Sequence, residues 1–191
     1  MKTVLVPLAK GFEEIEAVTI IDVLRRAQIE VIVASLGHVT LVQGAQGIVI
    51  EADVALENVA LDVAFADMPD MIILPGGVEG TYALAENKIV QNILKRMDDN
   101  GKNIAAICAA PFALNKAGVL KHNYTCYPSF EEQIRLDGYQ GDKAMVVEDG
   151  NVMTSRGPGT AICFALEIVK KLEGEEMYES LKSGLLADYC K

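Results

Sequence analysis

Short, continuous apolar runs are the feature that most constrains how this chain folds. Their positions are residues 3–7, 31–34, 71–74 and 103–107. Each run has the length of a strand that is buried on both faces. Segments with helical periodicity follow at residues 13–27, 88–100, 111–117, 161–172 and 175–186. Strands that alternate with helices predict an α/β fold in three layers, with a mostly parallel sheet and helices on both faces.

Two glycine-punctuated segments depart from this alternation. Residues 38–52 are rich in strand-forming residues and resemble a hairpin, and residues 144–147 and 152–155 flank a second turn signal at 148–151. No repeat, low-complexity tract or long linker interrupts the 191 residues. We therefore expect one domain, residues 1–191, and its 51% of hydrophobic residues suffice for a core without disulfides or metals.

The net charge, the lengths of the apolar runs and the spacing of the cysteines exclude several classes of partner and site. The net charge of −10 disfavours nucleic acid and anionic membranes as partners. No apolar run is long enough to cross a bilayer, and the first residues do not resemble a signal peptide. The spacing of cysteines and histidines does not fit a zinc site. We expect a cytoplasmic protein with free thiols at Cys108, Cys126, Cys163 and Cys190.

Cys108 is the most informative position. The apolar strand 103–107 runs almost directly into a helix that starts near Pro111. A residue at such a junction is forced outward on a tight turn, as in the nucleophile elbow of hydrolases. The amide-rich start of the helix favours thiolate, so a lowered pKa is predicted for Cys108. The alternative is an inert thiol buried in the core.

Three further segments are expected at the same rim of the sheet, where parallel strands end. Gly76 and Gly77 follow a strand and either present N–H groups to an oxyanion or form a plain turn. Glu13 and Glu16 share one face of the first helix, while Glu14 points elsewhere. A carboxyl beside a thiolate would have a raised pKa and keep its proton; otherwise these carboxylates simply complement the helix dipole. Residues 154–160 form a strand end, a glycine-proline turn and a helix start.

Taken together and in this order, these segments resemble the ThiJ/PfpI superfamily, most closely its parkinsonism-associated protein deglycase branch. The similarity spans residues 2–186. The matching stretches are residues 8–16, 22–27, 74–77, 105–111 and 154–160, which read LAKGFEEIE, DVLRRA, LPGG, AAICAAP and TSRGPGT. The resemblance implies a flavodoxin-like α/β sandwich that is usually a homodimer.

The resemblance also implies roles for individual residues. Cys108 matches the oxidisable nucleophile, and Glu16 matches the protonated carboxyl that hydrogen-bonds the sulfur and stabilises its sulfinate form. Arg26 matches an arginine near the dimer interface and the site. The backbone N–H groups that match the oxyanion site are those of Gly76, Gly77 and Ala109.

Several positions depart from the pattern of the family. Ala109 stands where protease-like members have a histidine, so a Cys-His dyad of adjacent residues is not available. Tyr127 replaces a histidine of the eukaryotic branch, although it can still donate a hydrogen bond. Gln46 replaces a site arginine, and Gly44 replaces a second reactive cysteine, for which Cys126 is a candidate local substitute.

These features lead to an expected function with one main alternative. The expectation is a cofactor-independent glyoxalase III or protein deglycase that acts on methylglyoxal-type α-oxoaldehydes or their adducts, with Cys108 and Glu16 as catalytic residues. The alternative is a non-enzymatic redox sensor of oxidative stress that works through Cys108 sulfinate. A thiol peptidase would need a histidine base, and neither His38 nor His122 lies in a matching motif.

Overall fold

A seven-stranded sheet forms the middle layer of the computed structural model, which describes residues 1–58 and 68–190. Neighbouring strands are parallel except for the antiparallel pair at one edge. In spatial order the strands are β5 (Val54–Ala55), β2 (Glu30–Ser35), β1 (Thr3–Leu8), β6 (Met71–Leu74), β7 (Asn103–Ile107), β9 (Val152–Ser155) and β8 (Val146–Asp149). The predicted mostly parallel α/β fold is confirmed.

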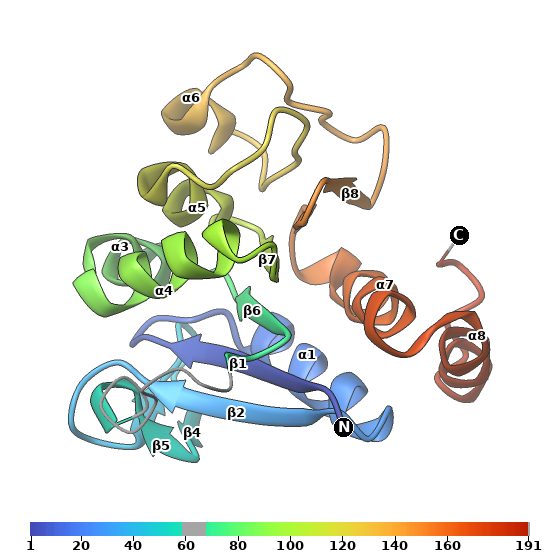
Figure 1. Ribbon diagram of the computed structural model, residues 1–191, viewed down its shortest axis with the longest axis horizontal. Helices are drawn as coiled ribbons and strands as arrows, with labels where there is room; N and C mark the ends of the chain where they lie inside the picture. Colours follow the sequence, from blue (N-terminus) through green and yellow to red (C-terminus); the bar gives the residue numbers. More distant parts are fainter. Residues whose placement is uncertain (59–67, 191) are drawn as a thin grey trace.

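Helices cover both faces of this sheet (Figure 1). On one face lie α1 (Glu14–Arg26) and α7 (Ala161–Glu173), with α8 (Glu175–Gly184) packed on α7. On the other face lie α3 (Val78–Glu86), α4 (Lys88–Asp99) and α5 (Pro111–Ala117). Among the described residues, no helix has both the length and the apolarity that crossing a membrane requires.

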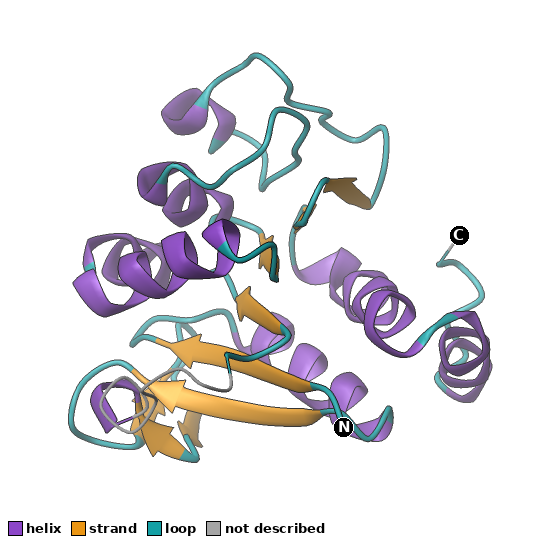
Figure 2. Cartoon of the chain, in the orientation of Figure 1, coloured by secondary structure: helices purple, strands orange, loops and turns teal. Residues whose placement is uncertain are grey.

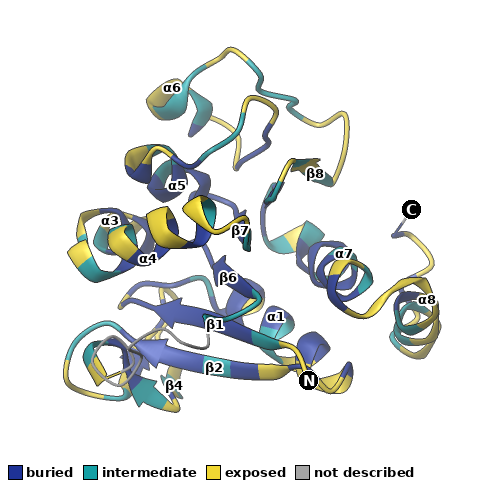
Figure 3. Cartoon of the chain, viewed as in Figure 1, coloured by how far each residue is buried: buried dark blue, intermediate teal, exposed yellow. Residues whose placement is uncertain are grey.

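Burial on both faces explains why the strands read as continuous apolar runs. Along β1, Val4 and Val6 pack into the core beneath α1 and α7, whereas Leu5 packs into the core beneath α4 and α5. The central strands are accordingly buried along their length (Figure 3). Alternate side chains of one strand thus pack into two separate cores, so both faces of the central strands are predominantly apolar.

A small hairpin stands apart from the main sheet. Strands β3 (Leu41–Gln43) and β4 (Val49–Glu51) pair antiparallel, which confirms the hairpin predicted within residues 38–52. Two backbone hydrogen bonds attach it to the loop after β1, from Gly11 N–H to the Gln43 carbonyl and from Ala45 N–H to the Phe12 carbonyl, both 2.8 Å. The hairpin is thereby held close to the carboxyl end of the sheet.

Local details differ from the sequence-based expectation. Two helices were not expected, α3 and the single-turn α6 (Glu131–Ile134). Helix α3 contains Gly80, which reads as a turn but lets the helix pack against Phe12, since a Cβ there would lie 3.1 Å from the Phe12 nitrogen. The edge strand β8 begins two residues later than expected, because the hairpin turn is only two residues long and Gly150 adopts φ +61°.

The expectation of four free thiols is wrong for two of them. Cys163 on α7 forms a disulfide with Cys190, 27 positions later, while Cys108 and Cys126 are free and buried. The pairing arises because α8 packs against α7 and the segment after α8 turns back toward α7, where Cys190 meets Cys163 (Figure 1). Disulfides are rare in reducing compartments, so the cytoplasmic location loses the support of free thiols and stays a prediction.

Replacing Cys190 with serine is expected to lower the free energy of unfolding by about 3 kcal/mol, because the loop closed by the disulfide no longer restricts the unfolded chain. Urea denaturation of the wild type and Cys190→Ser, each with and without a dithiol reductant, measures this. The reductant should destabilise the wild type and leave the variant unchanged. Equal midpoints for the wild type in both buffers would show that the disulfide contributes no stability.

Candidate active site

Cys108 occupies a strained turn at the end of β7. Its φ is +64°, in the left-handed region that non-glycine residues rarely adopt. The backbone is held from two sides: Cys108 N–H donates to the Ser155 carbonyl at 3.0 Å, and its carbonyl accepts from Tyr127 N–H at 2.8 Å. The residue is buried, with 9% of its surface exposed, but it lines a cavity and is therefore not sealed in the core. Strain of this kind persists only where the surroundings over-determine it, and here it directs the sulfur toward the rim of the sheet.

Glu16 brings a buried carboxyl to this sulfur from the first turn of α1. The residue is fully buried, and its Oε2 accepts a hydrogen bond from Gly76 N–H at 2.8 Å. Its Oε1 is buried without a nitrogen or oxygen partner, and the Cys108 thiol is the hydrogen-bonding group beside the carboxyl. Only glycine fits at position 76, because a Cβ there would lie 2.5 Å from Cys108 Cβ and 2.7 Å from Glu16 Oε2.

Two backbone N–H groups, those of Gly77 and Ala109, donate to the sulfur of Cys108. These are two of the three donors expected for an oxyanion. The third expectation is corrected, because Gly76 N–H is donated to Glu16 and is not free for a substrate. Gly76 therefore orients the carboxyl, whereas Gly77 and Ala109 supply positive dipole ends beside the sulfur.

The pKa values of the two groups move in the same direction. Burial raises the pKa of Glu16 to about 7, against the lowering effect of its hydrogen bonds with Gly76 and Cys108. Burial, followed by the negative charge of Glu16, raises the pKa of Cys108 to about 12. The raised pKa of Glu16 agrees with the expected protonated carboxyl. The lowered pKa expected for Cys108 is wrong, because burial and the carboxylate outweigh the two N–H donors.

A cavity of about 470 Å³ opens above the sulfur. Its size suits a small ligand. The walls come from the loop after β1 (Gly11 and Glu13), the turn of the β3–β4 hairpin (Ala45 and Gln46), the start of α3, Pro158, and the segment with Tyr127, Ser129 and Phe130. A second cavity, of about 570 Å³ between β8 and α7, contains none of the predicted site residues.

The structure brings most, but not all, of the predicted residues together. Tyr127 is half-exposed and lines the cavity, as does Gln46. Arg26 lies in the last turn of α1, about 15 Å along the helix from Glu16, and its Nε donates to Asp22 at 2.9 Å. Within one chain it does not belong to this site. Cys126 is fully buried and does not line the cavity.

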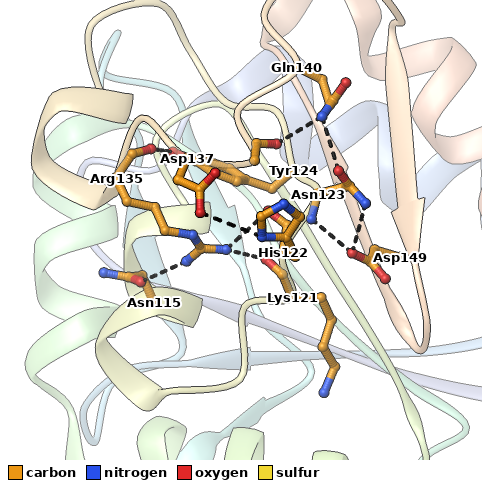
Figure 4. A network of polar contacts seen from close by, with 10 residues as sticks. Asn115, Lys121, His122, Asn123, Tyr124, Arg135, Asp137, Gln140 and Asp149 are labelled. Carbon is orange, nitrogen blue, oxygen red and sulfur yellow. Dashed lines mark hydrogen bonds and ion pairs between the residues drawn. The ribbon is translucent and has the colours of Figure 1, made fainter.

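Arg135 organises the wall that carries Tyr127. This wall belongs to the long, mostly irregular segment between α5 and β8 (Figure 2). The Arg135 guanidinium donates to the carbonyls of Lys121 and His122 and to Asn115, and it lies 5.0 Å from the centre of the Tyr124 ring (Figure 4). The Tyr124 hydroxyl in turn donates to the Arg135 carbonyl. These contacts close residues 121–135 into a unit although it contains only one helical turn.

Sequence reasoning missed Glu14, Phe130 and Arg135. Glu14 is 4% exposed and bonds the β3–β4 hairpin, although acidic residues in a first helical turn are ordinarily solvated. Phe130 and Arg135 lie in a segment without periodicity, so no pattern identified them. Within the described part of the chain, no three His, Cys, Asp or Glu side chains converge as metal ligands would.

Comparisons with known proteins agree with this geometry. The family model described as DJ-1/PfpI family matches residues 2–171. The Parkinson disease protein 7 homolog of Danio rerio is 40% identical over 187 residues, 97% of each chain. The glutathione-independent glyoxalase DJR-1.2 of Caenorhabditis elegans is 39% identical over 173 residues, 91% of this chain and 89% of the relative.

A solved structure supports the same relationship over nearly the whole chain. The crystal structure of Drosophila melanogaster DJ-1beta superposes with a TM-score of 0.90 and 43% identity, covering 97% of each chain. By sequence and by structure, this chain belongs to the DJ-1/PfpI family.

Proposed function

We propose that the protein is a cysteine-dependent glyoxalase or deglycase that acts on small α-oxoaldehydes such as methylglyoxal, or on their early adducts. The observation that carries this proposal is the contact between a strained, cavity-lining Cys108 and a buried carboxyl at Glu16. The relative from Caenorhabditis elegans that is named a glutathione-independent glyoxalase supports it.

The first step is attack of the Cys108 thiolate on the aldehyde carbon of methylglyoxal, which forms a carbon–sulfur bond and turns the carbonyl into an oxyanion. Gly77 and Ala109 donate to the sulfur, so their N–H groups lie next to the new oxyanion and stabilise its charge. The Glu16 carboxyl then protonates this oxygen and completes the hemithioacetal.

The second step moves one hydrogen between the two substrate carbons. The Glu16 carboxylate removes the proton from the former aldehyde carbon, and the resulting enediol takes a proton at the neighbouring carbon, which leaves a lactoyl thioester on Cys108. Water hydrolyses the thioester and releases lactate and the free cysteine. The net reaction adds one water to methylglyoxal, so the residues named here need no external oxidant or reductant.

The coupled charges of Glu16 and Cys108 explain how a buried thiol supplies a thiolate. The two groups adjoin in a buried site, so the pair loses its first proton long before its second. The single negative charge then takes one of two forms. In the first, a Glu16 carboxylate faces a Cys108 thiol; in the second, a Cys108 thiolate accepts a hydrogen bond from the Glu16 carboxyl. The negative charge that raises the pKa of Cys108 is absent in the second form, and the N–H groups of Gly77 and Ala109 stabilise it.

Redox sensing through the same sulfur is the second candidate function. A protonated Glu16 can donate a short, charge-assisted hydrogen bond to a sulfinate on Cys108, and the adjacent N–H groups favour the added negative charge. The site is partly open to its cavity, so a peroxide can reach the sulfur. Both candidate functions use the same pair of residues.

A homodimer is the assembly that we propose, in the cytoplasm. Exposed apolar side chains gather on α1 and on the hairpin that Glu14 ties to it, and such patches mark interfaces. They are Ile15, Val18, Leu41, Ile48 and Val49. A second copy of this chain would cover them and bring a further Arg26 to the same face.

Wild type incubated with methylglyoxal is expected to produce lactate, and Cys108→Ser is expected to produce none above background. Glu16→Gln should remain folded but lower kcat by about a hundredfold or more, because the proton transfers lose their general acid and base. Enzymatic assay of lactate measures both. If the wild type is also inactive, and peroxide adds two oxygen atoms at Cys108 alone, the sensor function replaces the enzyme.

The rate at which iodoacetamide alkylates Cys108 is expected to rise with pH through an apparent pKa of about 7, because the pair loses its first proton there and gains the thiolate form. Glu16→Gln should lose this step. Mass spectrometry of the modified peptide, at pH values from about 5 to about 10, gives the alkylation rate of each protein as a function of pH. Identical profiles in the two proteins would rule out the coupling.

Val18→Glu is expected to convert a dimer of about twice 20.6 kDa into a monomer, because it places a charge in the apolar patch. Light scattering after gel filtration measures the mass. Leu136→Glu is the matched control, since Leu136 is 72% exposed but lies beyond α6, away from α1. A monomeric wild type, or an unchanged Val18→Glu mass, contradicts this assembly.

A further inference from the structure

The wall of the Cys108 cavity that comes from the β3–β4 hairpin is exposed in the single chain, and the proposed dimer would cover Ile48 and Val49 beside it. Ala45 and Gln46 line the cavity, yet residues 45–49 are all exposed to solvent. The main chain closes the turn through Gly44 N–H donating to the Ile48 carbonyl at 2.8 Å. The bond from Ala45 N–H to the Phe12 carbonyl, at 2.8 Å, fixes the start of the turn, so the part from Gln46 to Ile48 depends on a further anchor.

Glu14 supplies that anchor from underneath. Its side chain is 4% exposed, and its Oε1 accepts from Gln46 N–H at 2.6 Å and lies 3.4 Å from Ile48 N–H. One buried oxygen therefore accepts hydrogen bonds from the amides of Gln46 and Ile48, the residues on either side of Gly47. The contact links α1, which carries Glu16, to the wall opposite the sulfur.

The chain at position 44 is shaped around this carboxyl. A Cβ on Gly44 would overlap the Glu14 side chain at Cγ, Cδ and Oε1. The other oxygen, Oε2, is buried without a partner, so the carboxyl is directed at the hairpin and at nothing else among the described residues. Its role is thus local to one wall of the cavity.

We propose that Glu14 is a positioning residue that fixes the hairpin turn and so determines how large a carbonyl compound reaches Cys108. This role rests on the proposed attack of Cys108 on small carbonyl substrates. Glu14 touches neither the sulfur nor the cavity, so it acts through Ala45 and Gln46. Without its carboxyl the turn loses both amide contacts and the mouth of the cavity widens.

The test compares a small and a bulky reagent of the same chemistry, iodoacetamide and N-phenyl iodoacetamide, on Cys108. In Glu14→Ala the ratio of the bulky rate to the small rate should rise about five- to tenfold over the wild type. Hydrogen exchange at the amides of residues 46 and 48 should accelerate in parallel. Glu14→Gln retains one acceptor oxygen and should restore the ratio to within about twofold.

A destabilised control separates positioning from a general loss of stability. Asn87 caps α4 by accepting from Ile89 and Val90 N–H at 2.9 and 3.0 Å, on the other side of the sheet. Asn87→Ala should lower the urea midpoint of unfolding and leave the ratio unchanged. An unchanged ratio in Glu14→Ala, or an equal change in Asn87→Ala, overturns the proposal.

The alkylation assay does not depend on turnover, so the two proposals fail separately. If the wild type makes no lactate but Glu14→Ala changes the ratio, the glyoxalase function is wrong and the positioning role stands. If lactate forms but the ratio is unchanged, the positioning role is wrong. In an active enzyme, kcat/KM for phenylglyoxal relative to methylglyoxal should shift in the same direction as the alkylation ratio.

Discussion

The contact between the Glu16 carboxyl and the Cys108 thiol requires the helix after β1 and the turn after β7 to meet across β6. In the sheet, β6 separates β1 from β7, and Gly76, two residues after the end of β6, lies against both side chains. The order of the strands therefore decides the contact, because a different order would separate the carboxyl and the thiol along the rim. Burial at this rim then raises the pKa of both groups.

The Glu16 carboxyl and the Cys108 thiol form a buried pair that carries one negative charge at a time. Neither residue alone is well suited to catalysis at neutral pH, since a buried thiol resists ionisation and a buried carboxyl resists it as well. Once the pair has lost its first proton, the remaining proton can lie on either group. When it lies on Glu16, the carboxyl donates a hydrogen bond to the Cys108 thiolate. The amides of Gly77 and Ala109 add dipoles without adding a titratable group.

Sequence alone predicted the parts of the structure that depend on local patterns. Strands buried on both faces leave continuous apolar runs, and the resemblance to a family located Cys108 and Glu16. The direction of the Cys108 pKa could not be read from the chain, because it depends on the depth of burial and on a carboxylate 92 positions away. The Cys163–Cys190 disulfide and the hairpin contact of Glu14 also depend on how distant segments fold back, which spacing does not reveal.

The packing around Gly76 has a consequence for how this site diversifies. Because even a methyl group there would collide with both Cys108 and Glu16, the centre of the site leaves no room for gradual change. The walls have no such restriction, and Gln46 and Tyr127 both lie on them. Substitutions that change which ligands the cavity accepts are therefore tolerated at its rim, whereas the packing of Cys108 against Glu16 tolerates none at Gly76.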